Sequence, residues 1–153
     1  MTHPRRRKQG AYTVELALVI PVLLAFIMGV LEAGNTIHHS VITAHATQEA
    51  VRQLAIGATL EGARTVLLDQ MGDPCCSAVS IEAEYRRRQG SGLTDWAPLP
   101  EDESGNTAPI GSQIRVTVTR RHALLFGTLF SRLAGNTGQA GIDLVVSRTT
   151  HRE

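Results

Sequence analysis

One carboxylate stands alone in the most apolar part of the sequence. Between Ala11 and Leu31 the only charged residue is Glu15. An ionised carboxylate in hydrocarbon costs at least about 2.5 kcal/mol, and a cation beside it would offset its desolvation. We therefore expect Glu15 to have a charged partner or a function.

The apolar segment around Glu15 has the length of a membrane span. Its 21 residues, Ala11 to Leu31, would form a helix about 30 Å long, which matches the hydrocarbon thickness of a bilayer. A basic run, Arg5 to Lys8, precedes it, and Lys and Arg beside a first span stay in the cytoplasm. The sequence therefore predicts a single-pass protein of the inner (cytoplasmic) membrane, with a cytoplasmic N-terminus and an extracytoplasmic C-terminal domain.

Three features concern the ends and the middle of this predicted span. We expect the helix to begin just after Gly10, because glycine disfavours helix. Pro21 predicts a kink or local unwinding, since proline lacks the N–H of the helical ladder. No Ala-x-Ala cleavage site closes the apolar run, so we expect the helix to stay in the membrane.

Charge and motifs argue against several classes of function. Without its first ten residues the chain has 11 basic and 14 acidic residues, a net charge of −3, and no basic stripe interleaved with aromatic residues. This balance gives no support to nucleic-acid binding. The sequence lacks G-x-S-x-G, H-E-x-x-H and P-loop motifs, so we predict no enzyme activity, no cofactor and no small-molecule substrate. His38, His39 and His45 lack the spacing and the further ligands of a metal site, and we interpret them as solvated helix surface.

Beyond the span the apolar residues recur at three- and four-residue steps. This period predicts that the first helix continues outside the membrane to about Ile56 and ends at Gly57. A second helix is expected to follow, with Thr59 as its N-cap and Gly72 at its end. The predicted apolar face of the first helix in this region is Ile37, Val41, Ala44, Val51, Leu54 and Ala55.

After Pro74 the apolar period changes from about 3.6 to 2. The alternation predicts strands over residues 79–86, 114–119 and from 142 to the end of the chain. Residues 89–111 are rich in Gly, Pro and acidic residues and are expected to form a long irregular loop. The predicted fold class is α+β, with a long N-terminal transmembrane helix continuing into an amphipathic helix and then a small antiparallel sheet. The predicted division of the chain is a basic leader (1–10), a transmembrane helix (11–34), an extended amphipathic helical segment (35–72) and a small extracytoplasmic β-rich domain (73–153).

Two further segments could make contacts of their own. Residues 122–136 contain six large apolar residues, and they form either a short helix over the sheet or an apolar surface for a partner. We predict that Phe126 or Phe130 contacts another subunit or the bilayer surface. Cys75 and Cys76 are adjacent in the exported part, where oxidation can occur. A disulfide between the two, a cross-link to a partner and no bond at all are the alternatives.

The N-terminal residues resemble the class III signal peptides of type IV pilin-like proteins. That pattern is a basic leader, a glycine, a glutamate five residues after the glycine, and an apolar helix. Here it is Gly10-Ala11-Tyr12-Thr13-Val14-Glu15. The segment AYTVELALVIPVLLAFIMGVLEAGN resembles the TadE-like family of pseudopilins, from tight-adherence (Flp) pilus systems. The predicted last strand, which ends Ser147-Arg148-Thr149-Thr150, also resembles this family.

The resemblance implies a pilin-like fold and a prepilin substrate. A prepilin peptidase would cut between Gly10 and Ala11 on the cytoplasmic face. The product would be a minor pseudopilin or assembly subunit of a Tad/Flp-type type IV pilus or related secretion apparatus. It would assemble through its N-terminal helix with other pilin subunits and an inner-membrane platform. The alternative is an uncleaved, single-pass, membrane-anchored binding or adaptor domain.

The chemistry of the motif agrees with this implied processing. Gly10 has no side chain to hinder a peptidase. Cleavage would create an α-ammonium at Ala11, one helical turn from Glu15 or within reach of a neighbouring subunit's Glu15. Such a pairing in a low-dielectric setting would offset the desolvation of the carboxylate.

Overall fold

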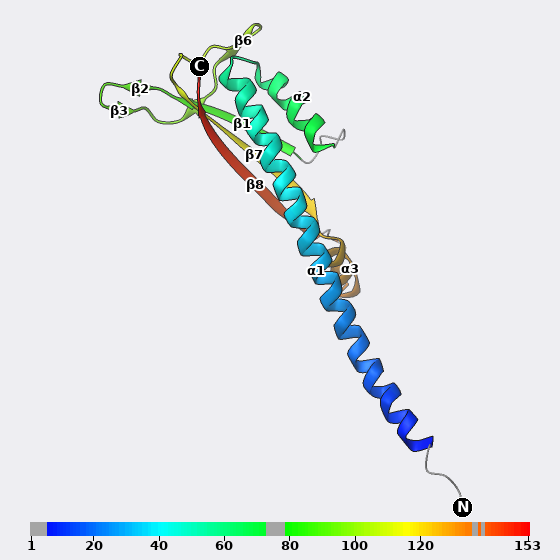
Figure 1. Cartoon of the computed structure of the whole chain (residues 1–153). Helices are drawn as coiled ribbons and strands as arrows, with labels where there is room; N and C mark the ends of the chain where they lie inside the picture. Colours follow the sequence, from blue (N-terminus) through cyan, green and yellow to red (C-terminus); the bar gives the residue numbers. More distant parts are fainter. Residues whose placement is uncertain (1–5, 73–78, 136–137, 139) are drawn as a thin grey trace, which may run out of the picture.

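One helix accounts for about a third of the chain. In the computed structural model, which describes residues 6–72, 79–135, 138 and 140–153, α1 (Arg6–Ala55) is a single helix of 50 residues. At ~1.5 Å per residue it is about 75 Å long. Figure 1 shows that the rest of the fold gathers on its C-terminal half and leaves the N-terminal half bare.

The start and the middle of α1 differ from the sequence prediction. The helix begins at Arg6 and not after Gly10. Residues 6–9 are good helix formers, and a long helix tolerates the roughly 1 kcal/mol by which an interior glycine disfavours it. Of the two alternatives predicted at Pro21, a kink or local unwinding, the unwinding is wrong, because the helix continues through this residue. The hydrogen-bonded turns on either side keep it in one piece, and Figure 1 shows no sharp bend.

The connection between the first two helices follows the prediction. After the end of α1, Gly57 has a φ of +100°, a value that suits glycine. α2 (Leu60–Met71) begins behind Thr59, whose hydroxyl accepts a hydrogen bond from Gly62 N–H at 3.0 Å. Gly72 ends α2 in the left-handed conformation, with a φ of +62°. The predicted N-cap and both glycine stops are confirmed.

Three long strands and one short strand form the main sheet. β1 (Val79–Arg86), β7 (Gln113–Ala123) and β8 (Gly141–His151) pair antiparallel, and β4 (Ala97–Pro98) pairs with β1. Their order is β4-β1-β7-β8. The three predicted strands and the α+β class are therefore confirmed, although β7 extends further than its apolar alternation predicted.

The prediction of an irregular loop over residues 89–111 is wrong in one respect, because this segment contains short strands. β2 (Arg88–Gln89) pairs with β3 (Gly92–Leu93), and β5 (Glu101–Asp102) pairs with β6 (Gly105–Asn106). Strands of two residues are too short to show an alternation of apolar and polar side chains, so periodicity could not reveal them.

The β5–β6 hairpin closes on itself and is tied to α1. The Asp102 carboxylate accepts hydrogen bonds from the Ser104 hydroxyl at 2.6 Å and the Ser104 N–H at 2.8 Å, which holds the pKa of Asp102 below its ordinary value. The amide of Asn106 donates to the carbonyl oxygens of Leu54 at 2.7 Å and Ala58 at 3.2 Å. Leu54 lies in the last turn of α1 and Ala58 in the connection to α2, so the Asn106 side chain ties the hairpin to the end of α1.

The core lies between one face of the sheet and the two helices. Ile114, Val116 and Val118 of β7 are fully buried, and Arg115 and Thr117 between them are not. This alternation places every second β7 side chain against the helices. The other buried members of the core are Ala46, Ala50, Val51 and Leu54 of α1 and Ala63, Leu67 and Met71 of α2.

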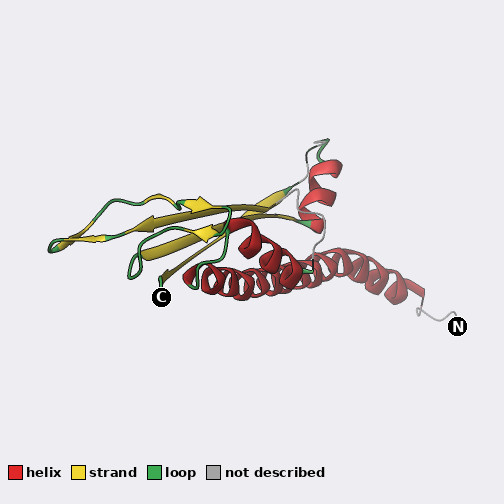
Figure 2. Ribbon diagram, turned by 90° about the horizontal axis from the view of Figure 1, so that it is seen from above, coloured by secondary structure: helices red, strands yellow, loops and turns green. Residues whose placement is uncertain are grey.

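A third helix connects β7 to β8. α3 (Leu125–Leu133) confirms a helix within residues 122–136, but it packs against α1 and does not cover the sheet. Figure 1 shows it beside α1 at the edge of the folded part, and Figure 2, seen from above, shows it projecting away from α1.

Candidate functional site

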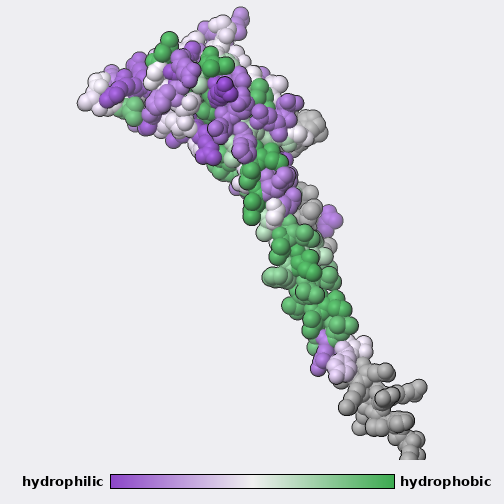
Figure 3. Space-filling model, viewed as in Figure 1, coloured by the Kyte–Doolittle hydropathy of each residue, from purple (hydrophilic) through white to green (hydrophobic). Residues whose placement is uncertain are grey.

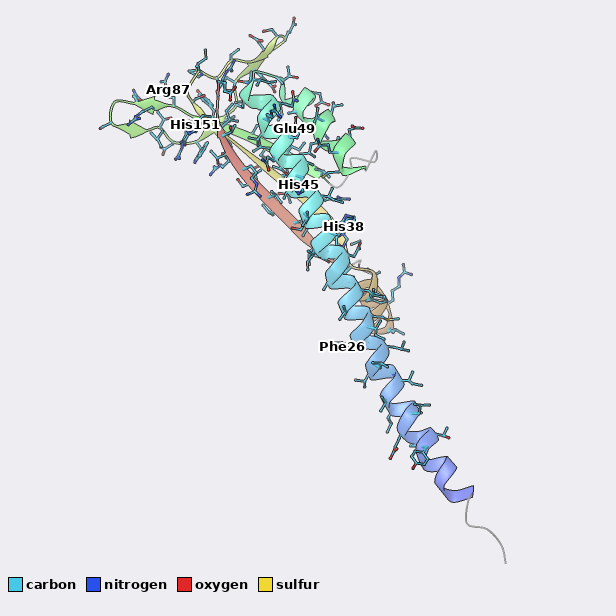
Figure 4. The ribbon with its side chains drawn as sticks, in the orientation of Figure 1. Phe26, His38, His45, Glu49, Arg87 and His151 are labelled. Carbon is cyan, nitrogen blue, oxygen red and sulfur yellow. The ribbon has the colours of Figure 1, made fainter. Side chains whose placement is uncertain are left out.

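Residues 12–27 of α1 form an exposed apolar rod. Every residue from Tyr12 to Ile27 is exposed, and Val22 and Phe26 retain 71% and 70% of their accessible surface. Figure 3 shows this rod as a continuous hydrophobic band, and Figure 4 places Phe26 on it, away from the sheet. Among the described residues, α1 is the one helix long and apolar enough to cross a membrane. A surface of this kind is stable only if lipid or protein covers it.

Glu15 lies within the exposed rod. Its side chain makes no ion pair with any side chain that the structure describes. Gly10 and Ala11 belong to the same uninterrupted helix, so Ala11 and Glu15 are one turn apart. The backbone thus provides the spacing that the predicted ammonium–carboxylate pairing needs, while the pairing itself stays a prediction.

Two opposite faces of α1 have different environments. The face toward the fold begins at Met28, Glu32 and Thr36, which are partly buried, and continues with Thr43 and Ala46, which are fully buried. At 3.6 residues per turn, the other face carries large apolar residues that stay exposed from the rod into the folded part. We call this set the apolar stripe, and its members are Leu23, Ile27, Val30, Ile37 and Val41.

The apolar stripe corrects one sequence prediction. Ile37 and Val41 were expected on the packed face of the helix, but they are 63% and 49% exposed. The residues packed there instead include Thr43 and Thr47, both fully buried. Their hydroxyls donate to the helix backbone, Thr47 to the Thr43 carbonyl at 2.7 Å, so neither is left unsatisfied. Small side chains allow the sheet to approach the helix closely, and hydropathy alone did not identify them.

Glu32 joins α1 to α3. Its carboxylate accepts a hydrogen bond from the Phe126 backbone N–H at 3.2 Å. Phe126 is the second residue of α3, so its N–H has no partner within that helix. A carboxylate at this position acts as an N-cap and interacts favourably with the helix dipole. Sequence spacing could not reveal this contact, because 94 residues separate the two partners.

The comparison with known families finds a match within α1. Residues 10–52 match the model of the family described as TadE-like protein. The chain is TadE-like over this segment. No match was found among curated proteins or among solved structures. The TadE-like segment begins at Gly10, contains Glu15 and Glu32, and ends within α1, so the resemblance is confirmed for the helix.

The histidines of the TadE-like segment do not gather into a metal site. Figure 4 shows His38 and His45 at different levels of α1. The His39 ring instead lies 4.7 Å from the ring of His122 on β7, centroid to centroid. Within the described residues there is no group of three or more His, Cys, Asp or Glu side chains with metal-binding geometry.

The structure describes only part of two predicted sites, the phenylalanine pair of α3 and the cysteine pair. The Phe126 side chain is partly buried, whereas the Phe130 side chain lies outside the described part of the structure. Cys75 and Cys76 also lie outside the described residues, between α2 and β1. Their predicted disulfide is therefore a question for experiment.

Proposed function

We propose that this TadE-like protein is a minor pseudopilin or assembly subunit of a Tad/Flp-type pilus or a related secretion apparatus. It has the N-terminal apolar helix expected of a Tad pilus component. The basic run before the helix favours a cytoplasmic N-terminus, with the sheet on the outer side of the inner membrane. Its proposed partners are a prepilin peptidase, other pilin or pseudopilin subunits and the inner-membrane assembly platform.

The observation that carries this proposal is the extent of the apolar stripe. A helix that serves only as an anchor needs apolar residues only within the bilayer. Ile37 and Val41 lie about 8 to 14 Å beyond Glu32 along the helix, yet they remain exposed on the side opposite the fold. A continuous apolar face of this kind favours packing against another helix, which supports assembly through α1.

Processing would prepare α1 for that assembly. Cleavage between Gly10 and Ala11 removes the basic residues and leaves an ammonium one turn from Glu15. The carboxylate then pairs with this ammonium or with that of a neighbouring subunit, which offsets its desolvation in the membrane. No catalytic activity and no bound cofactor are part of this proposal.

The first test is the N-terminus of the mature protein. N-terminal sequencing of the protein purified from its own membranes should show a start at Ala11. Gly10→Val should leave insertion intact and block removal of the leader, whereas Gly29→Val, at a glycine of α1 with open space around it, should be cleaved normally. A mature protein that still begins before Gly10 would support the uncleaved anchor instead.

The second test addresses the apolar stripe. The double substitution Ile37→Ser and Val41→Ser should abolish co-purification with other pilus components without lowering the Tm of the folded part. Ile110→Ser is the matched control, because Ile110 is 82% exposed but lies in the turn before β7. Normal co-purification of the double variant would mean that α1 does not assemble through this face.

A further inference from the structure

Helix α3 is strongly amphipathic, and the proposed function does not explain it. Five of its nine residues are large and apolar, and their spacing places them on one side of a helix. Leu133, at the end of α3, is 76% exposed. The apolar positions of the helix are Leu125, Phe126, Leu129, Phe130 and Leu133.

The level of α3 along α1 coincides with the end of the predicted span. The hydrogen bond from Phe126 N–H to the Glu32 carboxylate places the first turn of α3 beside Glu32. Glu32 is the first charged residue after Glu15. Residues 12–31, all exposed except Met28, cover about 30 Å of helix, the thickness of the hydrocarbon core. The N-terminus of α3 therefore lies where α1 would leave the bilayer.

The direction of α3 is that of a helix lying on a membrane. In Figure 1 it is foreshortened beside α1, whereas in Figure 2, turned by 90°, it extends away from α1. The two views agree that α3 lies across α1. If α1 crosses the bilayer, α3 runs along its surface.

The other side of α3 suits the same location. The Thr128 hydroxyl donates to the Leu124 carbonyl at 2.6 Å, and the Ser131 hydroxyl donates to the Gly138 carbonyl at 2.9 Å. These hydroxyls are satisfied within the protein and can lie at the edge of an apolar phase. Arg132 is exposed, and a long cationic side chain there can reach lipid headgroups.

We propose that α3 is an interfacial helix, embedded by its apolar side in the outer leaflet where α1 leaves the membrane and held there by Glu32. This inference rests on the membrane-spanning role of α1 in the proposed function. Amphipathic helices of this composition bury their apolar face at the boundary between headgroups and acyl chains.

Lipid fits α3 better than a second subunit does. Glu32 lies on the side of α1 that faces the fold, opposite the apolar stripe. Helices that pack along the stripe would leave α3 on the outside of the bundle. Leu133, an apolar residue of α3 that stays exposed, would then be accessible to the surrounding lipid.

The test is short-range fluorescence quenching by brominated lipid in the full chain. The protein is reconstituted in phosphatidylcholine–phosphatidylglycerol vesicles with and without brominated acyl chains. Trp96 supplies the baseline, because it is the one tryptophan and stacks on Arg86 and Arg115 at the far end of the sheet. A second tryptophan is introduced by Leu133→Trp in α3, by Val22→Trp in the span or by Ile110→Trp in the distal turn, all at exposed positions.

The expected result is quenching of the added tryptophan in Leu133→Trp, approaching that in Val22→Trp, and none in Ile110→Trp. Quenching of Val22→Trp without quenching of Leu133→Trp would overturn the inference while leaving the membrane span in place. In that case, protection of residue 133 only in the assembled apparatus would assign α3 to a neighbouring subunit. If Val22→Trp itself is not quenched, α1 is not in the bilayer, and both the span and the inference fail.

Discussion

Gly105 lies directly against the backbone carbonyl oxygen of Gly57, and a β-carbon at residue 105 would overlap that oxygen. The same oxygen accepts a hydrogen bond from Asn106 N–H at 3.1 Å. Arg152, near the C-terminus, hydrogen-bonds the backbone and the side chain of Asn106. The end of α1, the β5–β6 hairpin and the end of the chain therefore meet at one junction.

Gly105→Ala should break this junction. The φ of +152° at Gly105 disfavours any other residue, by about 1–3 kcal/mol, and the collision with the Gly57 carbonyl adds to this. We expect the Tm of the full chain in detergent to fall by at least roughly 5 °C. Gly92→Ala should have little effect, since Gly92 has open space around it. An unchanged Tm for Gly105→Ala would show that the hairpin is not held at this position.

Glu32→Ala should loosen α3 without unfolding the sheet. Loss of an N-cap costs about 1 kcal/mol, so amide hydrogen exchange in the first turn of α3 should accelerate roughly fivefold. Glu32→Gln retains an acceptor oxygen and should show a smaller change. Equal protection in the wild type and Glu32→Ala would argue that Glu32 does not hold α3.

Glu15→Val should separate processing from assembly. The variant should be inserted and cleaved, because the span and the Gly10–Ala11 bond are unchanged. It should fail to join the assembly, because the charge pairing that fixes its register is lost. One immunoblot follows the size shift and another follows co-purification with other pilus components. Glu103→Val, at an exposed glutamate of the hairpin tip, is the control, and normal assembly of Glu15→Val would remove the main physical support for the mechanism.

Phe126→Ser and Phe130→Ser should impair the contacts of α3 more than the fold. The double variant should keep a near-normal Tm and lose assembly or lipid contact, because the core that the structure describes between the sheet, α1 and α2 does not include Phe126. Thermal unfolding and co-purification are measured on the same preparation. Collapse of the folded part with intact assembly would instead make these two residues core.

Cys75 and Cys76 should form a disulfide in the oxidised protein, with the bond between the two slightly favoured over a cross-link to a partner. The exported location proposed for them would permit oxidation, although a bond between neighbours is strained. Mass spectrometry of non-reduced peptides distinguishes the two products by mass. Two free thiols in protein isolated without reductant would contradict the prediction.

Local rules predicted much of this fold. Unbroken apolar character predicted the long helix, Gly57 and Gly72 predicted the helix ends, and alternation predicted β1, β7 and β8. These features depend on residues close together in the sequence, where periodicity and capping act directly. The family resemblance was likewise carried by a short run of adjacent residues. The short strands between β1 and β7 were missed because they are held by backbone pairing and not by a pattern of side chains.

The sequence by itself determined the long apolar segment and the motif around Glu15, because both are continuous in the chain. Only the tertiary structure decided which side of α1 is covered. It packs Thr43 and Thr47 against the sheet and leaves Ile37 and Val41 exposed, since close approach of sheet and helix depends on side-chain size as well as on hydropathy. It also decided the place of α3. The end of β7 brings Phe126 beside Glu32, 94 positions earlier in the chain, and the hydrogen bond between them depends on this arrangement.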